Sequence, residues 1–211
     1  LHRPLTAFLV GGPTGPFLFN ARAAHRLQSI IRQVIEETGG TAYITTSRRT
    51  PPAVVEALQS DLPGAARLFT WSTDASDNPY RALLGLADGF VVTGDSISMM
   101  VEVVRLRKPL AILGLPVGVL GAFDQLRRSL TRWLFAPRCR GPLDRLRQAA
   151  GRVLYRMRIL THTRDFVAFH NMLVTKGLAV HAGEPLRAPT AGVPDDLAIA
   201  VQRIEALVRN S

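Results

Sequence analysis

The residues best suited to binding chemistry lie between Val91 and Glu102, in the sequence VVTGDSISMMVE. This stretch predicts a short buried strand, a tight turn at Gly94 and a helix that continues to about Arg107. Unpaired backbone N–H groups and the helix dipole favour anions at such a helix start, so the turn is a candidate phosphate cradle. The apolar face would comprise Ile97, Met100, Val101 and Val104, and the opposite side Asp95, Ser98, Met99 and Glu102.

This stretch has both a ligand-binding and a purely structural interpretation. Glu102 lies one turn inside the helix, where it would suit a hydrogen bond to a ribose hydroxyl better than a contact with phosphate. Asp95 or Ser96 could instead simply cap a half-buried crossover helix. A short motif of this kind does not decide between the two.

Two further loops carry residues of the same chemical type. The apolar run Leu5 to Val10 is followed at once by Gly11-Gly12-Pro13-Thr14, an order that lets a backbone approach a diphosphate closely. The spacing matches neither a dinucleotide fingerprint nor a Walker A loop. A second run, Thr41 to Thr46, leads into Ser47-Arg48-Arg49, where paired guanidinium groups could clamp phosphates.

The order of these elements predicts an α/β fold, a Rossmann-like, doubly wound and mostly parallel sheet. The expected strands are 5–10, 41–46, 68–71, 89–93 and 110–113, with helices between them. Parallel strands all end at one edge, so the three polar loops would share a rim, where open α/β sheets bind ligands. We expect three parts: a core at 1–114, a basic helical insertion at 115–163, and C-terminal helices at 164–211.

The second half of the chain is basic and amphipathic. Apolar residues recur at helical spacing from 120 to 134 and from 143 to 158, with arginines between them. This segment could bind an anionic membrane surface or a protein partner, or simply pack on the core with its arginines in solvent. Further helices are expected at 165–176 and 195–209, joined by a Pro- and Gly-rich linker at 184–194.

Composition bounds the class of protein. The 211 residues carry a net charge of +10, and of 26 basic residues only Lys108 and Lys176 are lysines. Such charge permits polyanionic partners, but nucleic acid is not expected because no aromatic stacking platform or recognised motif is present. The single Cys139 points to a reducing compartment. We expect no metal site, no cofactor and no membrane span, and a cytoplasmic chain that is at most peripheral at a membrane.

Three segments together resemble one known family, the "elongated mitochondria" mitochondrial-fission family, whose bacterial members are described as glycosyltransferases of the GT-B type. The segments are 10–13, 45–51, and 78–80 with 87–102. The resemblance covers residues 5–113, departs at about 115–162, and resumes weakly at 164–177. It implies that this chain is the nucleotide-sugar-binding, C-terminal half of a GT-B enzyme, with the N-terminal half absent or reduced; Leu1 is not a Met, which also fits a fragment.

The resemblance also implies roles for individual residues. Gly11, Gly12 and Thr14 would approach the diphosphate. Ser47 and Arg48 or Arg49 would contact phosphate, and the turn at Asn78 to Tyr80 would lie near the base. The diphosphate pocket and the ribose contact would be formed by Thr93, Asp95, Ser96, Ser98, Met99 and Glu102.

Asp95 is an awkward neighbour for a phosphate because like charges repel. It could cap the helix or bind the sugar instead. No catalytic residue is assigned.

Two functions stay open. The first is glycosyl transfer from a nucleoside-diphosphate sugar to an unknown acceptor. The second is a non-catalytic adaptor that recruits a protein or a membrane surface through the basic helices at 115–162.

Overall fold

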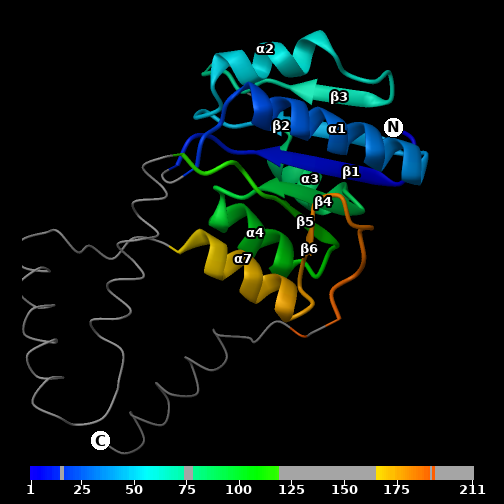
Figure 1. The fold of residues 1–211 in the computed structure, drawn as a ribbon. Coiled ribbons are helices and arrows are strands. Elements are labelled where there is room, and N and C mark those ends of the chain that lie inside the picture. The colour runs from blue at the N-terminus through cyan, green and yellow to red at the C-terminus, as the bar shows by residue number, and fades with distance from the viewer. Residues whose placement is uncertain (15–16, 74–77, 119–164, 191, 193–211) are drawn as a thin grey trace, which may run out of the picture.

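The computed structural model describes residues 1–14, 17–73, 78–118, 165–190 and 192. Strands and helices alternate along this part of the chain (Figure 1). The strands are β1 (Leu5–Val10), β2 (Thr41–Thr46), β3 (Ala66–Phe69), β4 (Gly89–Thr93), β5 (Leu110–Leu113) and β6 (Val180–His181). The helices are α1 (Ala21–Thr38), α2 (Pro52–Ser60), α3 (Tyr80–Leu86), α4 (Ile97–Arg105) and α7 (Phe166–Thr175).

The strands form one six-stranded sheet in the order β3-β2-β1-β4-β5-β6, and every neighbouring pair is parallel. The chain therefore winds outward from β1 to β3 and then returns to the other side of β1 with β4. This order confirms the predicted Rossmann-like α/β fold. It also places the topological switch point, where the winding direction reverses, between β1 and β4.

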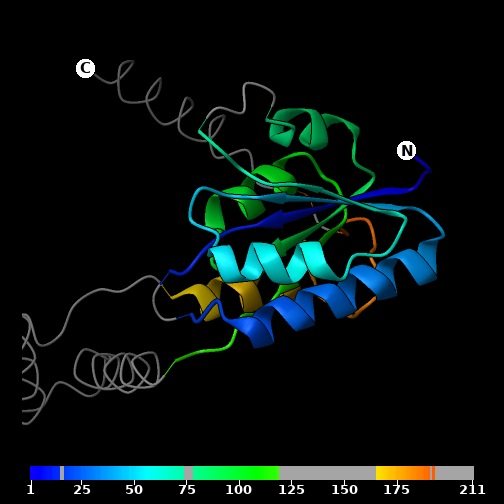
Figure 2. The same ribbon diagram turned by 90° about the horizontal axis from the view of Figure 1, so that it is seen from above.

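Apolar side chains cover both faces of the sheet. Phe8 and Val10 of β1 belong to the cluster that includes the buried faces of α1 and α2, whereas Ala7 and Leu9 belong to the cluster with α3 and α4. Figure 2 shows these two helix pairs on opposite sides of the sheet. Burial on both faces explains why the strands read as continuous apolar runs instead of alternating ones.

Helix α1 begins and ends where its sequence indicates. The Asn20 side chain accepts a hydrogen bond from the Ala23 N–H, and Gly39 closes the helix with a left-handed backbone, φ 64°. Between them, Leu27, Ile31 and neighbouring apolar residues at the predicted spacing are buried. This helix is the main cover of one sheet face.

A lysine side chain from outside helix α3 binds the carbonyl groups at the end of this helix. The Lys108 ammonium group donates hydrogen bonds to three main-chain carbonyl groups, those of Leu84, Gly85 and Ala87, at 2.6–2.9 Å. Carbonyl groups at a helix end lack partners within the helix, so this side chain satisfies them from outside. Just before it, Arg107 has a left-handed backbone, φ 54°.

Three local features differ from what the sequence predicted. The third strand lies two residues earlier than expected, at Ala66–Phe69, because its pairing with β2 starts at Ala66. Strand β6 was not predicted, since two residues give too short a pattern to recognise. Helix α4 ends at Arg105 instead of Arg107, and it buries Val103 more deeply than Val101.

The expected basic helices between 120 and 158 and the terminal helix at 195–209 lie outside the described residues. The described chain does fix where the first of these segments is attached. Val117 forms an isolated bridge with Phe17, and Asp165 caps α7 through the Ala168 N–H. Figure 1 shows the start of α7 and the end of the described chain after β5 toward the edge of the sheet where the strands end.

Candidate functional site

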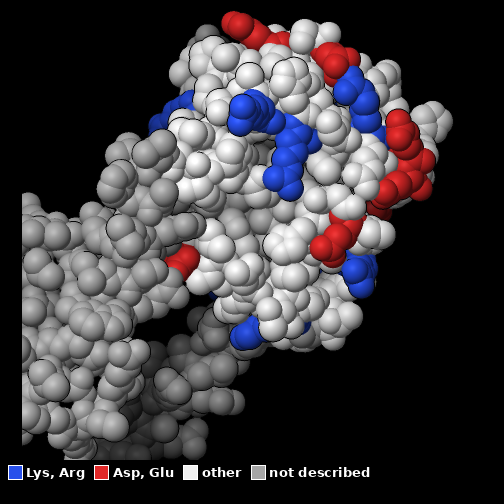
Figure 3. Space-filling view, viewed as in Figure 1, with Lys and Arg blue, Asp and Glu red and all other residues white. Residues whose placement is uncertain are grey.

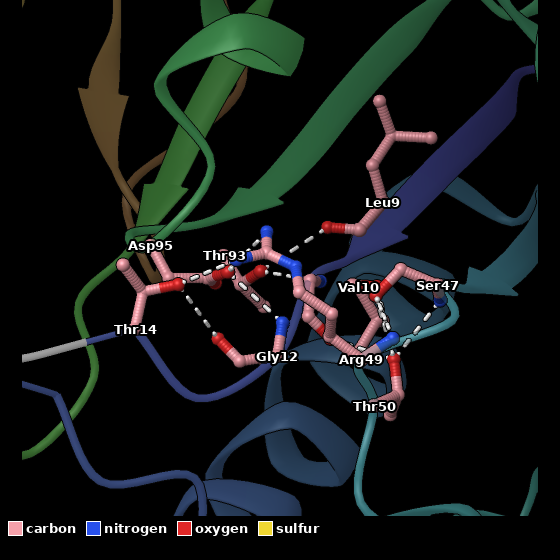
Figure 4. A network of polar contacts seen from close by, with 10 residues as sticks. Leu9, Val10, Gly12, Thr14, Ser47, Arg49, Thr50, Thr93 and Asp95 are labelled. Carbon is pink, nitrogen blue, oxygen red and sulfur yellow. Dashed lines mark hydrogen bonds and ion pairs between the residues drawn. The ribbon is translucent and has the colours of Figure 1, made fainter.

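The polar loops gather at the switch point, as the parallel fold requires. Gly11 and Gly12 follow β1, Ser47 to Thr50 follow β2, and Gly94 to Ser96 follow β4. We refer to these three loops as the rim. Figure 4 shows their side chains and backbone groups in one hydrogen-bonded network. The predicted meeting of the three loops is therefore observed.

The glycine turn after β1 lies very close to its neighbours. A Cβ atom on Gly11 would be 2.1 Å from Asp95 Oδ2, and one on Gly12 would be 2.2 Å from the main-chain oxygen of Arg49. The Gly11 N–H donates to Thr93 Oγ1 at 2.8 Å, and the Gly12 N–H donates to Asp95 Oδ2 at 2.9 Å. The absence of side chains at Gly11 and Gly12 thus lets other groups approach the backbone closely, and in this structure those groups belong to the protein itself.

Asp95 does not cap α4. Ser96 is the residue before the helix, and its side chain makes no capping hydrogen bond. The Asp95 carboxylate points across to Gly12 instead, with its side chain 0% exposed. Burial raises the pKa of this carboxyl group, while the Thr93 side chain, the Gly12 N–H and, more weakly, the Arg49 guanidinium lower it. Its second oxygen, Oδ1, has no hydrogen-bond partner.

Arg49 connects all three loops. Its Nη1 donates to Thr14 Oγ1 at 2.8 Å, and its Nη2 lies 3.8 Å from Asp95 Oδ2. Its side chain is 50% exposed, so part of the guanidinium faces solvent. A planar group with several donors and one open side is suited to an anion that arrives from solvent.

The loop after β2 is fixed by a residue that the sequence did not single out. Thr50 donates to the Gly11 oxygen at 2.6 Å and accepts from the Ser47 N–H at 2.9 Å. Ser47 Oγ in turn accepts from the Arg49 N–H at 3.3 Å. Ser47 therefore shapes the loop that presents Arg49. A hydroxyl two residues before the helical Pro52 was the signal that could have identified Thr50.

Glu102 has a partner from the α3 side. The Tyr80 hydroxyl donates to Glu102 Oε2 at 2.8 Å. Burial raises the pKa of Tyr80, and the hydrogen bond and the negative charge of Glu102 raise it further. The phenol thus stays protonated and holds the carboxylate. Both residues belong to the predicted base and ribose region, and the structure brings them together.

Other predicted residues do not join the network. Arg48, Ser98 and Asn78 are exposed; the Asn78 oxygen accepts only the nearby Tyr80 N–H, at 3.0 Å. Met99 packs partly buried against the α3–α4 core cluster. Ser96 is buried within the turn, whereas Thr93, also buried, does belong to the network through the Gly11 N–H. Their proposed contacts with a ligand stay predictions.

His170 of α7 is a second residue that the sequence did not assign to the rim. It is 7% exposed, stacks on Phe17 with ring centroids 6.3 Å apart, and lies so close to Gly94 that a Cβ there would be 2.9 Å from its Cε1. Its Nε2 has no partner. Burial lowers the pKa of His170, so the ring is neutral at neutral pH. Its place in the buried stripe with Phe166 and Leu173 was the available signal.

The charges of α1 run against its own dipole. Exposed Arg22 and Arg26 occupy the first turns, at the rim, and exposed Glu36 and Glu37 occupy the last turns. A helix is stabilised by the opposite arrangement, with acidic residues first. Figure 3 shows basic side chains on the part of this face nearer the rim and most acidic ones farther away. The rim side of α1 is thus positively charged, although this arrangement lowers the stability of the helix.

The described part of the chain contains neither a metal site nor a membrane-spanning helix. Its His, Cys, Asp and Glu residues form no group of three that could hold a metal ion. None of its helices combines the length and the apolar composition needed to span a bilayer.

Comparison with known proteins gives the family. The model of a family described as mitochondrial fission ELM1 matches residues 1–157, well over half of the chain. The chain belongs to this family. Within the ELM1 family it resembles the "Mitochondrial fission protein ELM1" of Arabidopsis thaliana, with 31% identity over 114 residues. It also resembles "Uncharacterized protein RP120" of Rickettsia prowazekii (strain Madrid E), with 31% identity over 111 residues.

The matched segments cover 54% and 52% of this chain but only 26% of the plant protein and 31% of the rickettsial one. The chain therefore matches about a quarter to a third of the length of these relatives. The family match also extends past residue 113, into the segment that we expected to depart from the family. It ends before 164–177, where we expected the resemblance to resume.

Proposed function

We propose that this ELM1-family chain binds a nucleoside-diphosphate sugar at the rim and forms the nucleotide-binding half of a GT-B glycosyltransferase. The observation that carries the proposal is the meeting of three carboxyl-end loops at the β1–β4 switch point, with the half-exposed Arg49 between them. Ligands of open α/β sheets bind at this point. The reversed charges of α1 favour an anion there.

Within this proposal each part of the rim has a task. Arg49 pairs with the diphosphate, aided by the positive ends of α1 and α4. Glu102, held by the Tyr80 hydroxyl, accepts hydrogen bonds from ribose. Catalysis would come from positioning the donor sugar and from stabilising the leaving nucleoside diphosphate. The acceptor is not specified by these residues.

Calorimetric titration with UDP-glucose and GDP-mannose tests the proposal. Glu102→Ala removes charged hydrogen bonds and should weaken binding by about 10- to 100-fold. Arg49→Gln should weaken it at least as much. Arg32→Gln is the matched control, because Arg32 lies on α1 and pairs with Asp61 away from the rim. Absence of saturable binding by either ligand would refute the proposal.

One observation favours the adaptor as a second candidate. The N–H groups of Gly11 and Gly12 already have protein partners, so the turn offers these two donors to a ligand only if the loops rearrange. Because the rim is filled by the protein's own side chains, the domain could keep this fold without binding a ligand there and act as an adaptor through another surface. Co-sedimentation with phosphatidylcholine vesicles, with and without phosphatidylserine, tests this. Binding that needs the anionic lipid and is lost without residues 115–162 supports the adaptor.

A further inference from the structure

A buried carboxylate lies directly behind the arginine that faces solvent. Asp95 Oδ2 has the Gly12 N–H at 2.9 Å and Arg49 Nη2 at 3.8 Å, while Oδ1 has no partner. A fully buried carboxylate is costly unless hydrogen bonds and a positive charge compensate it. The Thr93 hydroxyl, the Gly12 N–H and, beyond hydrogen-bond distance, the Arg49 guanidinium favour the charged form, but burial outweighs them and raises the pKa of Asp95.

Arg49 is the cation that faces Asp95 among the described residues. The β1 loop contributes Gly11, Gly12 and Thr14, which do not titrate. From α7 the neighbouring group is His170, whose pKa is lowered by burial, so that the ring is neutral at neutral pH. The first turn of α4 carries no acidic residue, and Glu102 farther along is exposed and bonded to Tyr80. Arg49 therefore supplies the positive charge beside Asp95, in addition to the hydrogen bonds from Thr93 and Gly12.

An anion at the exposed side of Arg49 would compete with Asp95 for the same positive charge. The guanidinium can form paired hydrogen bonds with a phosphate or sulfate, which the 3.8 Å approach to Asp95 does not provide. The ligand would also bring a second negative charge near a carboxylate that is 0% exposed. Two like charges in a poorly solvated site do not both stay ionised.

We infer that an anion bound at Arg49 causes Asp95 to take up a proton from solvent, so that Asp95 is a neutral carboxylic acid in the complex. The proton binds Oδ1, the oxygen without a partner, while Oδ2 keeps the Gly12 N–H. Asp95 then changes from a repelling charge into a hydrogen-bond donor. That the natural anion is a nucleoside diphosphate rests on the proposed function; the proton uptake does not.

Sulfate is the first probe, because it has no group that titrates near neutral pH. In the intact chain, sulfate affinity at about pH 5 to pH 8 should rise as pH falls, by up to about tenfold per pH unit for one proton. Calorimetry in buffers of different ionisation enthalpy should show uptake of up to about one proton. Asp95→Asn, which keeps an acceptor for Gly12, should bind sulfate with an affinity independent of pH.

Several outcomes would overturn the inference. One is an affinity for sulfate that does not change with pH in the unmodified chain. A second is an equal pH dependence in Asp95→Asn, or a dependence lost only in His170→Gln, which would make His170 the proton acceptor. A third is no sulfate binding at all, because the anion must first reach Arg49.

A measurement without ligand keeps the inference testable if a variant binds poorly. The carboxyl ¹³C resonance of Asp95 should titrate at a higher pH in Arg49→Gln than in the unmodified chain, because the compensating charge is gone. An unchanged titration would refute the link between the two residues.

UDP-glucose and GDP-mannose separate the two proposals. Sulfate binding with proton uptake, but no binding of either nucleotide sugar, would refute the proposed function and leave the inference standing. Nucleotide-sugar binding without proton uptake would refute the inference and leave the function standing.

Discussion

Gly11→Ala should destabilise the protein through one specific collision. The new methyl group would lie 2.1 Å from Asp95 Oδ2 and 2.7 Å from its Cγ. The backbone at Gly11 is not left-handed, so the obstacle is space and not conformation. The β1 loop cannot move away easily, because Thr50 and Thr93 hold its main chain. The Asp95 side chain must therefore move.

The cost follows from what that movement breaks. Displacing the carboxylate breaks its hydrogen bond with the Gly12 N–H and leaves that buried donor without a partner, worth about 1–3 kcal/mol. Fitting an extra methyl group into a packed site adds about 1–3 kcal/mol. We expect the free energy of unfolding to fall by about 3 kcal/mol. Urea denaturation followed by circular dichroism measures this change.

Two comparisons make the reasoning refutable. Gly114→Ala, just after β5, has no atom within 4 Å of the new methyl group and should change stability by less than about 0.5 kcal/mol. In an Asp95→Ala background, the colliding atoms are gone and Gly11→Ala should cost under about 1 kcal/mol. An equal cost in both backgrounds, or in both glycine variants, would refute the collision.

Three other perturbations have defined outcomes. Lys108→Met leaves three carbonyl groups at the end of α3 without their donor and should lower the free energy of unfolding by about 1–2 kcal/mol. Lys176→Met, at an exposed lysine, is the control and should leave the free energy of unfolding unchanged. Arg107→Gly should stabilise by about 1 kcal/mol because φ is 54°, whereas Arg105→Gly, at the last residue of α4, should destabilise by up to a similar amount; the same sign for both would contradict this. Because burial raises the pKa of Asp95 above 3.8, the native state keeps a proton that the unfolded chain has lost, so the free energy of unfolding should fall as pH rises from about 4 through that raised pKa. Asp95→Asn should lack this fall in urea titrations across the same pH range, and parallel curves would contradict it.

Most of the sheet could be predicted because its strands are buried on both faces. Runs such as Leu5 to Val10 end in glycine or polar loops, and their alternation with helices admits few topologies. Strand β6 was not predicted because the two residues Val180–His181 give almost no sequence pattern, and its position depends on pairing with β5. The boundaries of β3 depend on its register with β2, which a run of apolar residues does not encode.

The candidate site was predictable as a place but not as a set of contacts. Parallel strands require their end loops to meet, so the rim followed from the fold. The direction of the Asp95 side chain did not follow, because a capping role and a bond to Gly12 fit the same sequence. His170 lies far along the chain from Gly94, and only packing of α7 brings them together.

The two outer strands have a consequence for how copies of this chain meet. β3 has four residues and β6 has two, so each edge of the sheet exposes only a short row of backbone donors and acceptors. Beyond β6, the Glu184 N–H is already bonded to the His181 oxygen. Long, flat edges invite a strand from another molecule, and short ones offer too few hydrogen bonds to hold it. The described sheet is therefore protected against edge-to-edge aggregation by the brevity of its last strands.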